Sequence, residues 1–147
     1  MKSLQILVVE DEAVIASLLG EVLRGMGHEV CATEGAERDA IAAALRLSPD
    51  LIIVDEHLGD GSGLAVIEAV LGNGPVPHVF VTGDAMRIKR LRPDSVVLEK
   101  PYREIDLARA MQRAMLGAPA APARDLAPAS GLDFVARPMG GQVTEGL

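Results

Sequence analysis

The feature that most constrains this chain is a repeated alternation of short apolar runs with segments of helical spacing. Each run carries apolar residues at consecutive positions, which is typical of strands in a parallel sheet that is covered on both faces. Repeated strand–helix units require right-handed crossovers, and these crossovers place helices on both faces of the sheet. We therefore predict an α/β fold with a doubly wound parallel sheet, whose strands are residues 5–9, 29–33, 51–54, 78–82 and 96–98.

The segments between these runs have the spacing or composition of helices. Gly27 stands where a C-cap glycine would end the first helix, and Ser48-Pro49 ends the second. Pro93 follows the fourth segment closely, so the fourth helix is predicted to be short or absent. Residues 56–62 are rich in Gly and Asp and are predicted to form a flexible loop. The predicted helices are residues 14–26, 36–47, 63–71, 84–91 and 105–117.

The composition changes near residue 117. Sixteen of residues 117–147 are Ala, Pro or Gly, and no sustained apolar periodicity follows. Such a segment buries too little apolar surface to offset the entropy of ordering it. We expect a domain at residues 1–117 and a largely flexible tail at residues 118–147, with no output domain. The apolar run 132–135 is the exception, because it could dock elsewhere.

The charge and the cysteine content exclude several classes of protein. Twenty-one acidic and fourteen basic residues give a formal charge of −7, which disfavours direct DNA binding. The single cysteine excludes a disulfide framework and a multi-cysteine metal site. No apolar run approaches the length of a membrane span, and the N-terminus lacks the pattern of a signal peptide. We expect a cytoplasmic protein that does not contact the membrane.

Three carboxylates, a hydroxyl and an ammonium group lie at the carboxyl ends of four of the predicted strands. In an open α/β sheet, ligands bind beyond the carboxyl ends of the strands, so these side chains would converge if the strand order is 2-1-3-4-5. Neighbouring carboxylates repel one another unless a cation neutralises them, and oxygen ligands suit Mg²⁺. A carboxylate, a metal and fixed donors indicate phosphoryl transfer. The residues are Glu10, Asp11, Asp55, Thr82 and Lys100.

These positions make residues 1–117 resemble a response-regulator receiver domain. Receivers carry an acidic pair, a phosphoacceptor aspartate, a threonine or serine, and a Lys-Pro pair in this order. The resemblance implies a flavodoxin-like (βα)5 fold with strand order 2-1-3-4-5. The matching segments are Val9-Glu10-Asp11, Val54-Asp55, Val81-Thr82-Gly83 and Glu99-Lys100-Pro101.

The resemblance also implies a reaction and its participants. Asp55 is expected to accept a phosphoryl group from a histidine kinase or a phosphotransfer protein, with Thr82 and Lys100 as the other catalytic residues. Such a protein signals through protein–protein contacts and catalyses only its own phosphoryl transfer and dephosphorylation, so no enzyme activity toward other substrates is expected. The downstream partner is not indicated, and a homodimer stays an open alternative.

A magnesium site is implied in the same way. The resemblance assigns as its ligands Glu10, Asp11, Asp55 and the main-chain carbonyl of His57, which lies two residues after the acceptor.

Two departures from the usual receiver pattern point to a subgroup. Val97 stands three residues before the lysine, where most receivers have Tyr or Phe, so a switch based on an aromatic rotamer is not expected. Thr82 and Lys100 are eighteen positions apart, which leaves a short or absent fourth helix. Both departures, together with Phe80-Val81-Thr82-Gly83 and with Gly59 in place of a usual proline, resemble the alphaproteobacterial receivers with a Phe-x-Thr-Gly motif. Many of those receivers stand alone and work with histidine kinases of the HWE/HisKA2 type.

Two alternatives stay open at this point. The chain could be a pseudo-receiver, an interaction module that is never phosphorylated. It could also be a haloacid-dehalogenase-type phosphatase, but that class needs a second aspartate two residues after the nucleophile, and His57 occupies that position. The basic cluster is either a solvated surface segment, which is the preferred interpretation, or a contact for an acidic partner or nucleic acid; its residues are Arg87, Lys89, Arg90 and Arg92.

Overall fold

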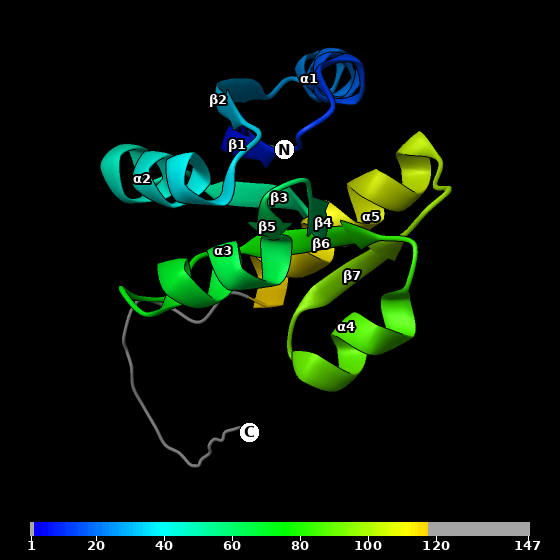
Figure 1. Cartoon of the computed structure of the whole chain (residues 1–147). Coiled ribbons are helices and arrows are strands. Elements are labelled where there is room, and N and C mark those ends of the chain that lie inside the picture. The colour runs from blue at the N-terminus through cyan, green and yellow to red at the C-terminus, as the bar shows by residue number, and fades with distance from the viewer. Residues whose placement is uncertain (1, 118–147) are drawn as a thin grey trace. The chain divides into compact units, whose positions relative to one another are not determined.

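A computed structural model describes residues 2–117 of the chain. Its centre is a five-stranded parallel sheet in the order β2-β1-β3-β6-β7 (Figure 1). Counted along the chain, this is the predicted order 2-1-3-4-5, so the doubly wound fold is confirmed. The sheet strands are β1 (Gln5–Val9), β2 (Glu29–Glu34), β3 (Leu51–Asp55), β6 (His78–Thr82) and β7 (Val96–Glu99).

The helices cover both faces of the sheet, and alternate strand residues separate the two cores. Ile6 and Val8 of β1 point into the core beneath α1 (Ala13–Gly25) and α5 (Glu104–Gly117). Leu7 and Val9 point into the opposite core, which α2 (Glu37–Leu47), α3 (Gly63–Leu71) and α4 (Ala85–Leu91) complete. Figure 1 shows α1 and α5 on one side of the sheet and the other three helices on the other side. All five residues of β3 are buried, because this strand lies in the middle of the sheet.

Local backbone geometry explains where the helices end. Gly27 has a φ of 96° just past α1, a conformation that glycine adopts without steric cost. Ser48 ends α2 in the left-handed conformation, with a φ of 47°. The fourth helix is short rather than absent: α4 has 7 residues, and the side chain of its N-cap Asp84 accepts a hydrogen bond from the backbone N–H of Arg87.

The prediction of a flexible loop at residues 56–62 was wrong. This segment forms an antiparallel hairpin of β4 (His57–Leu58) and β5 (Gly61–Ser62), with His57 opposite Ser62. The Ser62 hydroxyl then accepts a hydrogen bond from the backbone N–H of Ala65 and caps α3, as the sequence predicts. Gly63 packs so closely on β3 that an added Cβ would overlap the carbonyl oxygen of Asp55. The composition of the segment indicated a turn but not the strand pairing around it.

The predicted tail at residues 118–147, with its apolar run 132–135, lies outside the residues that the structure describes. Among residues 2–117, no helix is both long enough and apolar enough to cross a membrane.

Candidate functional site

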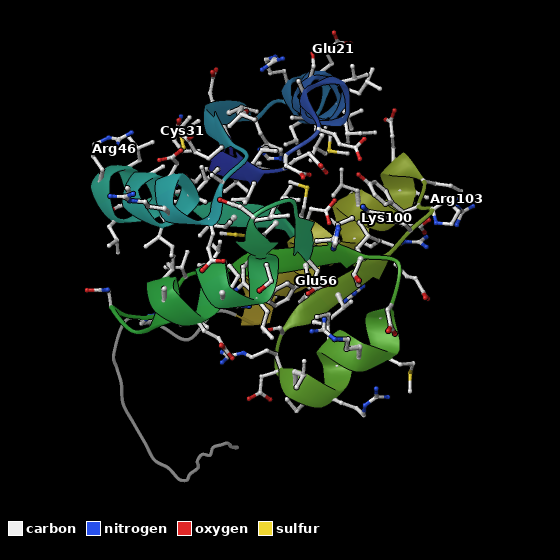
Figure 2. The ribbon with its side chains drawn as sticks, in the orientation of Figure 1. Glu21, Cys31, Arg46, Glu56, Lys100 and Arg103 are labelled. Carbon is white, nitrogen blue, oxygen red and sulfur yellow. The ribbon has the colours of Figure 1, made fainter. Side chains whose placement is uncertain are left out.

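The carboxyl ends of the parallel strands bring the predicted site residues to one edge of the sheet. Asp55 is the last residue of the central strand β3 and is 6% exposed. Glu10 directly follows β1 and is 8% exposed, and Thr82 ends β6 at 4% exposure. Lys100 directly follows β7. In Figure 2 the labelled Lys100 lies near the middle of the view, whereas Arg103 points outward at the rim.

Asp55 has a partner on each carboxylate oxygen. The Nζ of Lys100 lies 2.7 Å from Oδ2, and the backbone N–H of His57 donates to Oδ1 at 2.9 Å. Burial alone would lower the pKa of Lys100, but the hydrogen bond to Asp55 and the charges of Asp55 and Glu10 outweigh it and raise that pKa. Lys100 therefore stays a cation at neutral pH and holds the Asp55 carboxylate in place.

Glu10 is the most perturbed acid of the site. Its pKa is raised from the ordinary value of 4.5 to about 7, first by burial and then by the neighbouring carboxyl group of Asp55. The backbone N–H of Glu12 donates to Glu10 Oε2 at 3.1 Å and partly opposes this rise. Two buried carboxyl groups thus share the single positive charge of Lys100. A further cation at this place would relieve their repulsion.

Asp11 points toward the β4–β5 hairpin instead of toward Asp55. Its Oδ2 accepts a hydrogen bond of 2.8 Å from the backbone N–H of Gly59. Consistently, no three His, Cys, Asp or Glu side chains within residues 2–117 converge in a ready metal site. The donor set still fits Mg²⁺ in its chemistry, because it offers carboxylate oxygens with too little positive charge nearby. Asp11 would have to turn away from Gly59 to join the other ligands.

Thr82 links the site to the first turn of α4. Its Oγ1 accepts a hydrogen bond of 3.0 Å from the backbone N–H of Asp84, and its carbonyl oxygen accepts one of 2.8 Å from the backbone N–H of Lys100. The hydroxyl proton of Thr82 is still available for an acceptor at the site. Val97 lies opposite Phe80 in the register of β6 and β7 and packs against the buried core on that face of the sheet.

Sequence reasoning missed an ion pair made by Glu56, the residue after Asp55. The Nη1 of Arg87 lies 2.8 Å from Oε2 of Glu56, the residue that follows Asp55. The partners are 31 positions apart in the chain. Neither position belongs to the motif that carries the resemblance, so the sequence offered no signal for this pair beyond the basic character of residues 87–92.

A groove opens next to the site, between α1 and α5. Its volume is about 590 Å³, and its floor includes Glu10, Asp55 and Lys100. The aliphatic side chains of Ile15 and Leu18 on α1 line it and are 43% and 55% exposed. The Asp55 carboxylate, although nearly buried, therefore lies beside a path from the surface.

The fold and this set of residues define a receiver domain. Residues 6–112 match the family model of the response regulator receiver domain, and the chain belongs to that family. The resemblance inferred from the motif positions is thus confirmed.

Relatives of known structure and sequence agree with this assignment. The solution structure of the Erythrobacter litoralis PhyR receiver domain matches with a TM-score of 0.73 and 27% identity, covering 84% of this chain and 98% of that one. The phyllosphere-induced regulator PhyR of Methylorubrum extorquens is 30% identical over 115 residues, which are 76% of this chain and 43% of that protein. The transcriptional regulatory protein PdtaR of Mycobacterium tuberculosis is also 30% identical over 115 residues, 76% of this chain and 56% of that protein. The chain thus spans about half the length of the curated relatives it matches.

Proposed function

We propose that this chain is a phosphorylated response regulator whose acceptor is Asp55. The observation that carries the proposal is the 2.7 Å contact between Lys100 Nζ and the nearly buried Asp55 carboxylate, with the Glu10 carboxyl group beside it. An isolated ion pair at this place has no structural need for a second carboxyl group. A site that transfers phosphoryl groups needs a second carboxyl group, because the site has to hold cations around a highly charged group.

The chain's own residues account for the transfer. An ionised Asp55 oxygen attacks the phosphorus of a phosphohistidine, so that an O–P bond forms, the P–N bond breaks and the electron pair stays on the histidine nitrogen. The ammonium of Lys100 then pairs with an oxygen of the transferred group. The hydroxyl of Thr82 donates to another phosphoryl oxygen while it keeps its hydrogen bond from Asp84.

Glu10, Asp11, Asp55 and the main-chain carbonyl of His57 are the residues that would hold Mg²⁺. When bound, the ion supplies positive charge that neutralises the carboxylates and the developing charge on the phosphoryl oxygens.

We infer that the output is a change in protein–protein contacts. A PhyR protein of Bartonella quintana, 25% identical with a TM-score of 0.68, is described as an anti-anti-sigma factor. A partner of the anti-sigma kind is therefore a candidate for this chain as well. We propose a histidine kinase of the HWE/HisKA2 type or a phosphotransfer protein as the phosphoryl donor. We also propose a cytoplasmic location, no direct DNA binding and no activity on other substrates.

The pseudo-receiver is the competing function, because it would have the same fold and the same sheet edge. Mass spectrometry of the intact protein after treatment with acetyl phosphate and Mg²⁺ separates the two. We expect one added phosphoryl group on the wild-type protein, lost on treatment with hydroxylamine as an acyl phosphate is. Wild-type protein that stays unlabelled, both under these conditions and with purified histidine kinases, would establish the pseudo-receiver instead.

Three variants locate the reaction. Asp55→Asn should abolish labelling, and the exposed Asp60→Asn is the matched control in the adjacent hairpin. Lys100→Ala should impair the response to phosphorylation more than it impairs folding, since the Lys100 side chain is 42% exposed. Stable labelling of the Asp55→Asn protein would place the chemistry at another residue.

A further inference from the structure

The ion pair between Glu56 and Arg87 involves the residue that directly follows Asp55 in the chain, and it has no part in the reaction described above. Glu56 follows Asp55 directly in the chain, and its side chain is 15% exposed. The Arg87 side chain comes from the middle of α4 and is 45% exposed. In Figure 2 the labelled Glu56 and Lys100 both lie over the central part of the sheet, whereas Glu21 and Arg46 point outward at the rim.

The two partners differ in how firmly they are held. The backbone of Glu56 is fixed, because its N–H donates to the carbonyl of Val81 at 2.9 Å and its carbonyl accepts from Gly63 N–H at 2.8 Å. The Arg87 guanidinium makes one side-chain hydrogen bond within residues 2–117, the one to Glu56. A guanidinium has five N–H donors, so Arg87 has donors left for a second anion.

We propose that Arg87 is a second phosphoryl-binding cation, held by Glu56 until Asp55 is phosphorylated. This inference rests on the proposed function of Asp55. Transfer adds a group with about −1.5 to −2 charge at neutral pH and three strong acceptor oxygens to Asp55, the residue that precedes Glu56 in the chain. The guanidinium fork matches phosphate geometry and is weakly hydrated, so it moves readily from a carboxylate to a neighbouring phosphoryl group.

This arrangement makes Glu56 and Arg87 act in opposite directions. Arg87 favours the phosphorylated form, because it adds a cation to the phosphoryl group. Glu56 opposes that form, because it competes for the same guanidinium. The backbone N–H of Arg87 donates to Asp84, and the backbone N–H of Asp84 donates to Thr82. A movement of the Arg87 guanidinium therefore also displaces the start of α4. Arg87 is therefore a residue that both binds the phosphoryl group and transmits its presence.

The test measures the affinity of the full chain for beryllofluoride, a phosphoryl mimic, in the presence of Mg²⁺. Backbone amide shifts during a titration give the Kd of each variant. Because the pair is partly exposed, Arg87→Ala should weaken binding about two- to fivefold, and Glu56→Gln should strengthen it by a similar factor. Arg87→Lys keeps the charge without the fork and should fall between wild type and Arg87→Ala. Arg90→Ala, an exposed basic residue on the same helix, is the matched control and should leave the Kd unchanged.

The double variant with both substitutions separates competition from simple charge repulsion. If Glu56 acts by holding Arg87, the gain from Glu56→Gln should shrink in the Arg87→Ala background. A gain of equal or larger size there would overturn the proposal, because it would show that Glu56 acts through its charge alone.

The remaining outcomes are equally decisive. Changes in the same direction for both single variants, or no change in either, would show that the pair only supports the fold and would overturn the inference. Thermal melting shows whether each variant folds. If Arg87→Ala does not fold, the change in Kd of Arg87→Lys shows whether Arg87 favours or opposes beryllofluoride binding. Absence of beryllofluoride binding by the wild-type protein would instead overturn the proposed function of Asp55, and with it this inference.

Discussion

Replacing Glu10 with Gln should stabilise the protein in the absence of divalent metal. Glu10 is 8% exposed, and burial together with the carboxyl group of Asp55 raises its pKa from 4.5 to about 7. At pH 8 the native state therefore holds an ionised group that would be better solvated in the unfolded chain. Glutamine has the same length and carries no charge, so it keeps the packing and removes the repulsion.

The magnitude follows from the linkage between protonation and folding. Between pH 4.5 and 7 the native Glu10 binds a proton more tightly than the unfolded chain does, so the free energy of unfolding falls as the pH rises through this window. A pKa rise of this size corresponds to at most about 3 kcal/mol, and partial access of water and salt leads us to expect about 1–3 kcal/mol. For a domain of this size, each kcal/mol shifts the Tm by about 3–6 °C.

Urea unfolding of the wild-type and Glu10→Gln proteins in EDTA, from about pH 4 to pH 8, is the assay. The variant should be more stable at pH 8, and the difference should vanish near pH 4, where Glu10 is protonated in both states. Glu21→Gln, on the exposed face of α1, is the control and should show no such pH dependence. A Glu10→Gln protein that is no more stable at pH 8, or whose gain is the same at every pH, would refute this account of the site's electrostatics.

Three further outcomes are expected. Millimolar Mg²⁺ should raise the Tm of the wild-type protein, and Asp11→Asn should reduce this gain; melting in EDTA must be measured as well, because removing a carboxylate can itself stabilise the site. Gly63→Ala should cost about 1–3 kcal/mol in unfolding free energy, measured by urea titration, because its Cβ would overlap the backbone of β3. Thr82→Ala should still be phosphorylated, but amide shifts of residues 84–91 should no longer respond to beryllofluoride; changes confined to α5 in the wild-type protein would contradict this route.

The sequence was sufficient to predict the position of most site residues. Parallel strands end at one edge of the sheet, so any polar residue that follows a strand is placed there before a structure is known. Glu10, Asp55, Thr82 and Lys100 all follow this rule, and the structure brings Asp55 and Lys100 to 2.7 Å. The strand order itself came from the resemblance to receivers, because apolar periodicity identifies strands without ordering them.

The remaining features depend on contacts between segments that no local pattern encodes. The β4–β5 pairing, and the close packing of Gly63 on β3 directly after it, were not indicated by composition alone. The orientation of Asp11 depends on the backbone N–H of Gly59, 48 positions away. Position in the sequence predicts which edge of the sheet a side chain occupies, but the partner of each oxygen is decided by the tertiary packing.

The contacts that lead from Asp55 to α4 give the proposed response a route that needs no aromatic residue at position 97. Val97 is paired in register with Phe80 and packed against the core, so it has no large side chain to move. The contacts between the site and α4 are direct. Thr82 accepts a hydrogen bond from Asp84, the N-cap of α4, and Arg87 of the same helix pairs with Glu56. Each of these contacts is partly exposed or shared, and each is worth about 1 kcal/mol or less. Their sum is comparable to the roughly 1–3 kcal/mol that typically couples two sites. A seven-residue helix with so few buried side chains is the element of this fold that such an energy can move.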